Sequence, residues 1–149
     1  MRQILALMVM LLSLSASGQS DSVTFCKKRL KVPTGCSAES EYQVKCDHYS
    51  MTWLYMTAEM MQTMPDQFIN KLASRLKGFR KEPVTCFLLG SEAKGYKIRY
   101  NTGSQTGFQL VAYGVANEQP VLFQLVLDRE PQSIDDIPDL ALEIISFNK

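Results

Sequence analysis

Residues 94–147 decide the fold, and they read KGYKIRYNTGSQTGFQLVAYGVANEQPVLFQLVLDREPQSIDDIPDLALEIISF. Side chains alternate between apolar and basic over residues 96–100, which predicts a strand with one face toward the core and one toward water. Residues 108–116 are apolar on both faces, as in a central strand that is covered on both sides. Alternation returns over residues 121–127, and residues 137–147 carry the apolar spacing of a closing helix. We therefore expect strands followed by a helix.

An amphipathic helix is predicted upstream of these strands, within a helical region spanning residues 57–79. Apolar side chains recur along one stripe of it, and polar side chains occupy the other side. The run Met64-Pro65-Asp66 marks the start of this helix, because proline is tolerated and an acid is favoured in a first turn. The other predicted elements are a strand at 22–32, a polar loop at 36–40, a hairpin at 42–56, a strand at 83–89 and a polar loop at 101–107.

Together these elements predict a single α+β domain over residues 19–149. We expect an antiparallel β-sheet of about six to seven strands, with the central amphipathic helix and the C-terminal helix packed on it. The chain is long enough for one domain with a modest core.

Residues 1–18 are predicted to be a signal peptide. A positively charged start precedes an apolar run over residues 4–14, and small side chains follow. We expect cleavage after Ser17 or Gly18, which leaves Gly18 or Gln19 at the mature terminus, followed by the domain at residues 19–149. No integral membrane segment is expected after cleavage, because no other apolar run is long enough to cross a bilayer. The predicted location is the periplasm or the extracellular space.

The even number of cysteines predicts disulfide bonds, since an exported chain meets an oxidising compartment. The cysteines are Cys26, Cys36, Cys46 and Cys86. We favour a local bond between Cys36 and Cys46 and a long-range bond between Cys26 and Cys86, but spacing alone leaves the other pairings open. A zinc site is not expected, because no two cysteines have the spacing of a zinc knuckle and His48 is the only histidine.

Charge and absent motifs argue against several functions. The chain has 16 basic and 15 acidic residues, and loss of Arg2 with the signal peptide would balance them. A near-neutral chain is unsuited to nucleic acid, which needs a basic face, or to electrostatic membrane binding. The sequence has no phosphate loop, dinucleotide fingerprint or nucleophile elbow. We interpret His48 as an exposed turn residue, and we expect neither enzymatic activity nor a cofactor.

Two strand aromatics and one arginine are the candidate interface residues. Aromatic side chains dominate interface energetics, so an aromatic on an open sheet face would anchor a partner. We single out Trp53, Tyr55 and Arg99, and the competing interpretation is cross-strand packing. A dense set of methionines, at positions 51, 56, 60, 61 and 64, is interpreted as core filling, with an apolar ligand groove or a copper site as the alternative.

Three packing motifs allow a comparison with known families. They are the amphipathic helix at 66–79, the strand Gly95-Tyr96-Lys97-Ile98-Arg99-Tyr100, and the ending from Ile137-Pro138-Asp139-Leu140 to Ile145-Ser146-Phe147. In these features the chain resembles the PsbP/Mog1/DcrB-like superfamily over residues 65–147. The resemblance implies a compact α+β sandwich used for protein association, with no catalytic residue set.

Three functional hypotheses follow. The first is a non-enzymatic exported domain, stabilised by disulfides, that binds another protein of the cell envelope. The second is a periplasmic immunity protein that neutralises a secreted antibacterial toxin. The third is a small ligand carrier or hydrolase, which would need a cleft with convergent polar groups or an apolar cavity.

Overall fold

The structure, a computed structural model, describes residues 20–147. The predicted signal peptide, residues 1–18, lies outside the described residues. Within them the chain forms ten strands, one helix of 12 residues and three shorter helical segments. Strands hold 53% of these residues and helices 17%.

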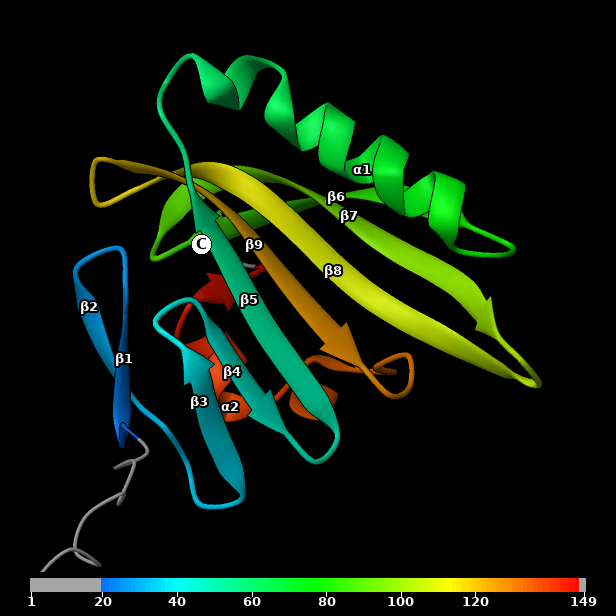
Figure 1. Cartoon of the computed structure of the whole chain (residues 1–149), viewed down its shortest axis with the longest axis horizontal. Coiled ribbons are helices and arrows are strands. Elements are labelled where there is room, and N and C mark those ends of the chain that lie inside the picture. Colours follow the sequence, from blue (N-terminus) through cyan, green and yellow to red (C-terminus); the bar gives the residue numbers. More distant parts are fainter. Residues whose placement is uncertain (1–19, 148–149) are drawn as a thin grey trace, which may run out of the picture.

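Eight strands form one curled antiparallel sheet, in the order β10-β6-β7-β8-β9-β5-β4-β3 (Figure 1). They are β3 (Cys36–Ser40), β4 (Gln43–Cys46), β5 (Tyr49–Tyr55), β6 (Arg80–Leu88), β7 (Ser91–Thr102), β8 (Gln105–Ala116), β9 (Gln119–Leu127) and β10 (Ile145–Ser146). A separate two-stranded hairpin is made by β1 (Ser22–Phe25) and β2 (Lys28–Lys31).

The prediction of an α+β fold is wrong, because the domain is mostly β. The sheet has more strands than expected, and a further hairpin lies outside it. The helical parts are α1 (Met64–Arg75) and the short segments η1 (Met60–Gln62), η2 (Ile134–Asp136) and α2 (Asp139–Leu142). α1 is not central to the fold: it lies across one face of the sheet (Figure 1).

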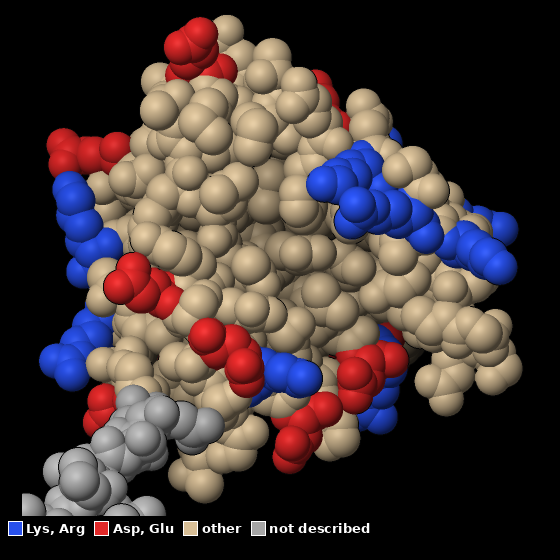
Figure 2. All heavy atoms as spheres, viewed as in Figure 1, with Lys and Arg blue, Asp and Glu red and all other residues tan. Residues whose placement is uncertain are grey.

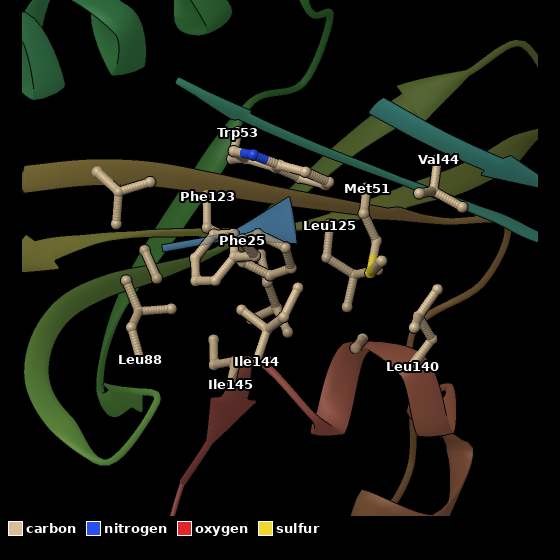
Figure 3. Packing of buried hydrophobic residues seen from close by; sticks show 14 of the residues in the cluster. Phe25, Val44, Met51, Trp53, Leu88, Phe123, Leu125, Leu140, Ile144 and Ile145 are labelled. Atoms are coloured by element: carbon tan, nitrogen blue, oxygen red, sulfur yellow. The ribbon is translucent and has the colours of Figure 1, made fainter. Parts of the chain in front are cut away.

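Each face of the sheet carries its own buried core. On one face α1 covers a cluster that includes Ile98 and Val111. On the other face the β1–β2 hairpin and the chain from η2 to β10 cover a larger cluster. Figure 3 shows this larger core. The ring centre of Phe25, from the hairpin, lies 5.6 Å from the ring centre of Trp53 and 5.8 Å from that of Phe123. The hairpin is therefore attached to the sheet through its aromatic side chain.

β8 is the central strand predicted from residues 108–116. It pairs with β7 on one side and with β9 on the other. Leu110 and Ala112 belong to the larger core, whereas Val111 belongs to the cluster under α1. Both faces of the strand are covered, so apolar side chains are favourable on both. The prediction of this strand is confirmed.

The predicted start of the main helix is confirmed, but the helical region is shorter than residues 57–79. α1 begins at Met64-Pro65-Asp66 and ends before Leu76, whose backbone is extended. The chain then turns at Gly78, which has a φ of +65°. A Cβ at this position would meet the side-chain amide of Asn101, which is exposed and can move, so the positive φ is the reason that glycine is favoured here.

The closing helix predicted at residues 137–147 ends after one turn. α2 spans four residues, and the chain then enters β10, where Ile145 pairs with Leu88 of β6. The spacing of the buried apolar residues is that of a helix, but the β-branched side chains of Ile144 and Ile145 favour a strand. Tertiary pairing decides, because the Leu89 N–H donates to the carbonyl of Ile144 at 2.8 Å.

Polar segments also join strands where loops were expected. The predicted loop at 36–40 is β3, and most of the predicted loop at 101–107 belongs to β7 and β8. The predicted strand at 22–32 folds back at Cys26 and Lys27, whose φ angles are 45° and 70°. Backbone pairing makes no demand on side-chain polarity at exposed positions, so polarity alone misled these predictions. The predicted hairpin at 42–56 and the strand at 83–89 are present as β4–β5 and within β6.

Candidate functional site

The local disulfide forms as expected. Cys36 and Cys46 are direct cross-strand partners on β3 and β4, with Cα atoms 4.2 Å apart and a disulfide between them. Disulfides persist in oxidising compartments, so this bond is consistent with a periplasmic or extracellular setting.

The expected bond between Cys26 and Cys86 is not formed, and both residues are buried free thiols. Burial raises the pKa of each thiol to about 11. At neutral pH both thiols are therefore protonated, and a protonated thiol is a poor nucleophile. Cys26 lies at the turn of the β1–β2 hairpin and Cys86 lies on β6, so their pairing depended on tertiary placement that spacing does not encode.

Two of the three candidate interface residues lie against the hairpin. Trp53 is 2% exposed, and its indole nitrogen is buried without a hydrogen-bond partner within residues 20–147. The Tyr55 hydroxyl accepts a hydrogen bond from the N–H of Cys26 at 2.8 Å and donates to the carbonyl of Thr24 at 3.2 Å. These contacts are those of the packing alternative, in which both aromatics hold the hairpin on the sheet.

Arg99, the third candidate, is the centre of an ion-pair cluster. Its Nε lies 2.9 Å from both carboxylate oxygens of Glu130, and its Nη1 lies 3.3 Å from Glu82. The hydrogen bonds from Arg99 lower the pKa of Glu130, and the same bonds, with those to Glu82, raise the pKa of Arg99. Arg80 is the direct cross-strand neighbour of Arg99. The two acids therefore offset a like-charge contact that would otherwise be unfavourable.

A cavity of about 380 Å³ lies beside this cluster, on the face of the larger core. Phe108, Leu110 and Ile137 give it apolar walls, and Lys97 and Glu130 bring charge to its lining. Further lining comes from Val84 and Thr85 of β6, from residues 131–134 and from Phe147. An apolar hollow with a few polar groups is the usual form of a binding site. No periodicity in the sequence indicated it, because its walls come from separate parts of the chain.

The cavity borders the outer side of β6, which is mostly without a strand neighbour in the described part of the chain. β10 pairs only with Phe87 and Leu88. The β6–β7 hairpin turns through two residues with positive φ, which lie between the cross-strand partners Leu88 and Ser91. In a two-residue loop of this kind, the pair of residues that flanks the loop is hydrogen-bonded. Alternation along β6 then leaves the backbone groups of every second residue, including Thr85, pointing outward.

Pro83 is one of these outward positions. A proline there loses no hydrogen bond of the ladder, because its missing N–H would have pointed away from β7. Proline and lysine on an edge also discourage indiscriminate pairing with other strands. The N–H and C=O groups of Lys81 and Thr85, together with the C=O of Pro83, remain as the outward donors and acceptors on this side of β6.

The methionine group does not line one cavity. Met51 is buried in the larger core and Met56 in the cluster under α1, so the sheet separates them. Met60, Met61 and Met64 pack against the second cluster. Their role is core filling on opposite faces of the sheet, as the sequence interpretation favoured.

At the site, Arg99 forms salt bridges with Glu130 and Glu82. His48 lies elsewhere, exposed, with its Nδ1 3.2 Å from Asp128. Within residues 20–147 no group of three or more His, Cys, Asp or Glu is placed to hold a metal ion. No helix of this part of the chain is long and apolar enough to cross a membrane. A comparison with protein-family models and with curated proteins finds no match to the chain.

Proposed function

We propose that this protein is a non-enzymatic, exported binding domain that holds an extended segment of another protein along β6. The observation that carries the proposal is the cavity beneath the outer side of β6. An extended peptide satisfies outward backbone groups by adding a strand, and pockets beside the edge select its side chains. The cavity next to Thr85 supplies such a pocket, with room for an apolar side chain.

The disulfide supports an oxidising compartment for this domain. Together with the predicted signal peptide, it favours the periplasm or the extracellular space, where the partner would be another envelope or secreted protein. A toxin encoded by a neighbouring gene would be the partner if the domain acts as an immunity protein.

The test removes one outward donor from β6. Thr85→Pro deletes the N–H of Thr85 without affecting a bond to β7, and Pro83 shows that this strand accepts proline two residues away. Thr85→Val keeps the N–H and is the matched control. We expect Thr85→Pro to abolish capture of a stoichiometric partner from envelope extract and Thr85→Val to retain it. Equal capture by both variants would exclude strand addition at β6.

A further inference from the structure

A basic surface lies at the start of β6 and on the end of α1. Between Asp66 and Glu82 the sequence has five basic residues and no acid. All five side chains are exposed, and we call them the basic surface: Lys71, Arg75, Lys77, Arg80 and Lys81. Figure 2 shows basic side chains gathered over α1 and the loop that follows it. The near-neutral total charge of the chain conceals this local excess.

No side chain of the basic surface forms an ion pair within the described part of the chain, and Arg80 is the member whose cross-strand neighbour, Arg99, is paired with Glu82 and Glu130. The five ion pairs found within residues 20–147 all join other residues. Of the 15 acids of the chain, five are in these ion pairs: Glu82, Glu118, Asp128, Glu130 and Glu143. Clustered like charges repel one another and destabilise the compact state, so an uncompensated cluster favours an external anionic partner.

The basic surface meets the site at the start of β6, where Arg80 points to the face of the cavity and Lys81 to the face covered by α1. Arg80 and Lys81 are the first residues of this strand, and the cavity lies beside Val84 and Thr85 of the same strand. The Nζ of Lys81 lies 4.9 Å from the ring centre of Tyr96, a cation–π contact that holds it near the strand. At about 3.4 Å per residue, Lys81 and Thr85 are separated by roughly 14 Å along an extended chain.

We propose that the segment held along β6 contains an apolar residue that anchors it and acidic residues that lie in sequence on one side of that residue. This inference rests on the proposed function. The apolar side chain enters the cavity, and aspartates or glutamates roughly four residues further on meet Arg80, Lys81 and Lys77. β10 runs antiparallel to β6. A strand that continues in the direction of β10 has its acidic residues C-terminal to its apolar residue.

The structure favours an acidic protein segment over an anionic membrane. Helices that bind membranes insert an apolar face, whereas Ile69 is 2% exposed and Phe68, Leu72 and Leu76 pack on the sheet. The exposed side of α1 therefore offers charge without an apolar face. The outward backbone groups of β6 are also useful to a peptide and not to a lipid headgroup.

The experiment measures binding of three synthetic peptides by fluorescence anisotropy. The first carries a leucine followed by glutamates at the spacing given above, the second replaces each glutamate with glutamine, and the third reverses the order. The protein variants are Lys77→Glu/Lys81→Glu and a matched control, Lys31→Glu/Lys45→Glu, which makes the same change of net charge at exposed lysines outside the basic surface. Circular dichroism checks that each variant is folded.

We expect the first peptide to bind most tightly, and its affinity to fall steeply with added salt. The Lys77→Glu/Lys81→Glu variant should lose roughly tenfold or more in affinity, and the control less than about threefold. Equal loss in both variants would show a response to net charge alone and overturn the inference. Tighter binding to vesicles containing phosphatidylserine than to any peptide would also overturn it, in favour of a lipid surface.

The Thr85→Pro variant separates this inference from the proposed function. If the glutamine peptide binds as tightly as the glutamate peptide and Thr85→Pro abolishes both, the site on β6 stands and its preference for acids is wrong. If the glutamate peptide binds equally well to Thr85→Pro, the basic surface acts without strand addition and the proposed function is wrong. Absence of binding by all three peptides contradicts both.

Discussion

Arg99 has a structural role as well as a position at the site. It faces Arg80 across the β6–β7 pair and is neutralised by Glu130 and Glu82. Glu130 follows β9, so the ion pair also ties the returning chain to the sheet near the cavity. Both partners are about one-third exposed, with side-chain exposures of 35% and 33%. Solvent therefore screens the pair, and its contribution to stability is modest.

Glu130→Gln should lower the free energy of unfolding by about 0.5–1 kcal/mol at pH 7. The folded-state pKa of Glu130 lies below its ordinary value of 4.5. The stabilisation is therefore present above pH 4.5 and is lost as the pH falls through the folded-state pKa. Urea unfolding at a series of pH values measures the difference between wild type and variant.

Asp135→Asn is the control for this prediction, since it removes an exposed acid that makes no ion pair within residues 20–147. Its unfolding free energy should stay close to that of the wild type at pH 7. A difference for Glu130→Gln that does not shrink in acid would rule out the ion pair as its cause.

At the scale of the element, the β7–β8 pair shows why long strands need small residues at particular positions. Gly107 lies directly opposite Tyr100. A Cβ on Gly107 would lie 2.4 Å from the Tyr100 ring, which covers the glycine backbone. Tyr100 is only 8% exposed, so its ring has little room to move away.

Gly107→Ala should therefore destabilise the protein by about 1–3 kcal/mol through overpacking. In a Tyr100→Leu background the same change should cost less than about 1 kcal/mol, because the ring that it meets is gone. Chemical unfolding of the four proteins in this double-mutant cycle gives the coupling. Equal costs in both backgrounds would show that the steric contact with Tyr100 does not limit this position.

At the scale of the whole molecule, a small hairpin completes the larger core. The β1–β2 hairpin has no strand pairing with the eight-stranded sheet. Its attachment depends on side chains, chiefly Phe25 against Trp53 and Phe123, and on the hydrogen bonds of Tyr55. Burial of the apolar side chains of the hairpin, of which Phe25 is the largest, therefore connects two separately paired sheets.

Phe25→Ala should cost about 3–5 kcal/mol, because Phe25 is fully buried and the cavity left behind lies between two sheets. Trp53 is the only tryptophan of the chain and lies against Phe25, so its fluorescence reports the transition in urea. Val115→Ala, at a residue that is 49% exposed, is the control and should cost less than about 0.5 kcal/mol. A similar small cost for Phe25→Ala would mean that the hairpin is detached in solution.

The sequence by itself determined the features that depend on neighbouring residues. The apolar run at 108–116 identified the central strand, and Met64-Pro65-Asp66 identified the start of α1. The short spacing of Cys36 and Cys46 favoured the local disulfide. These patterns are legible because side-chain periodicity, helix-start chemistry and short loop closure act over a few residues.

Only the tertiary structure decided the features that depend on distant partners. Ile144 and Ile145 enter a strand because β6 offers them backbone hydrogen bonds, although their spacing also suits a helix. Trp53 is in the core because a hairpin formed much earlier in the chain covers it. The cavity exists because residues 130–137 return beside Val84. Backbone pairing and burial are set by which segments meet, and that contact is a property of the folded chain rather than of any local pattern.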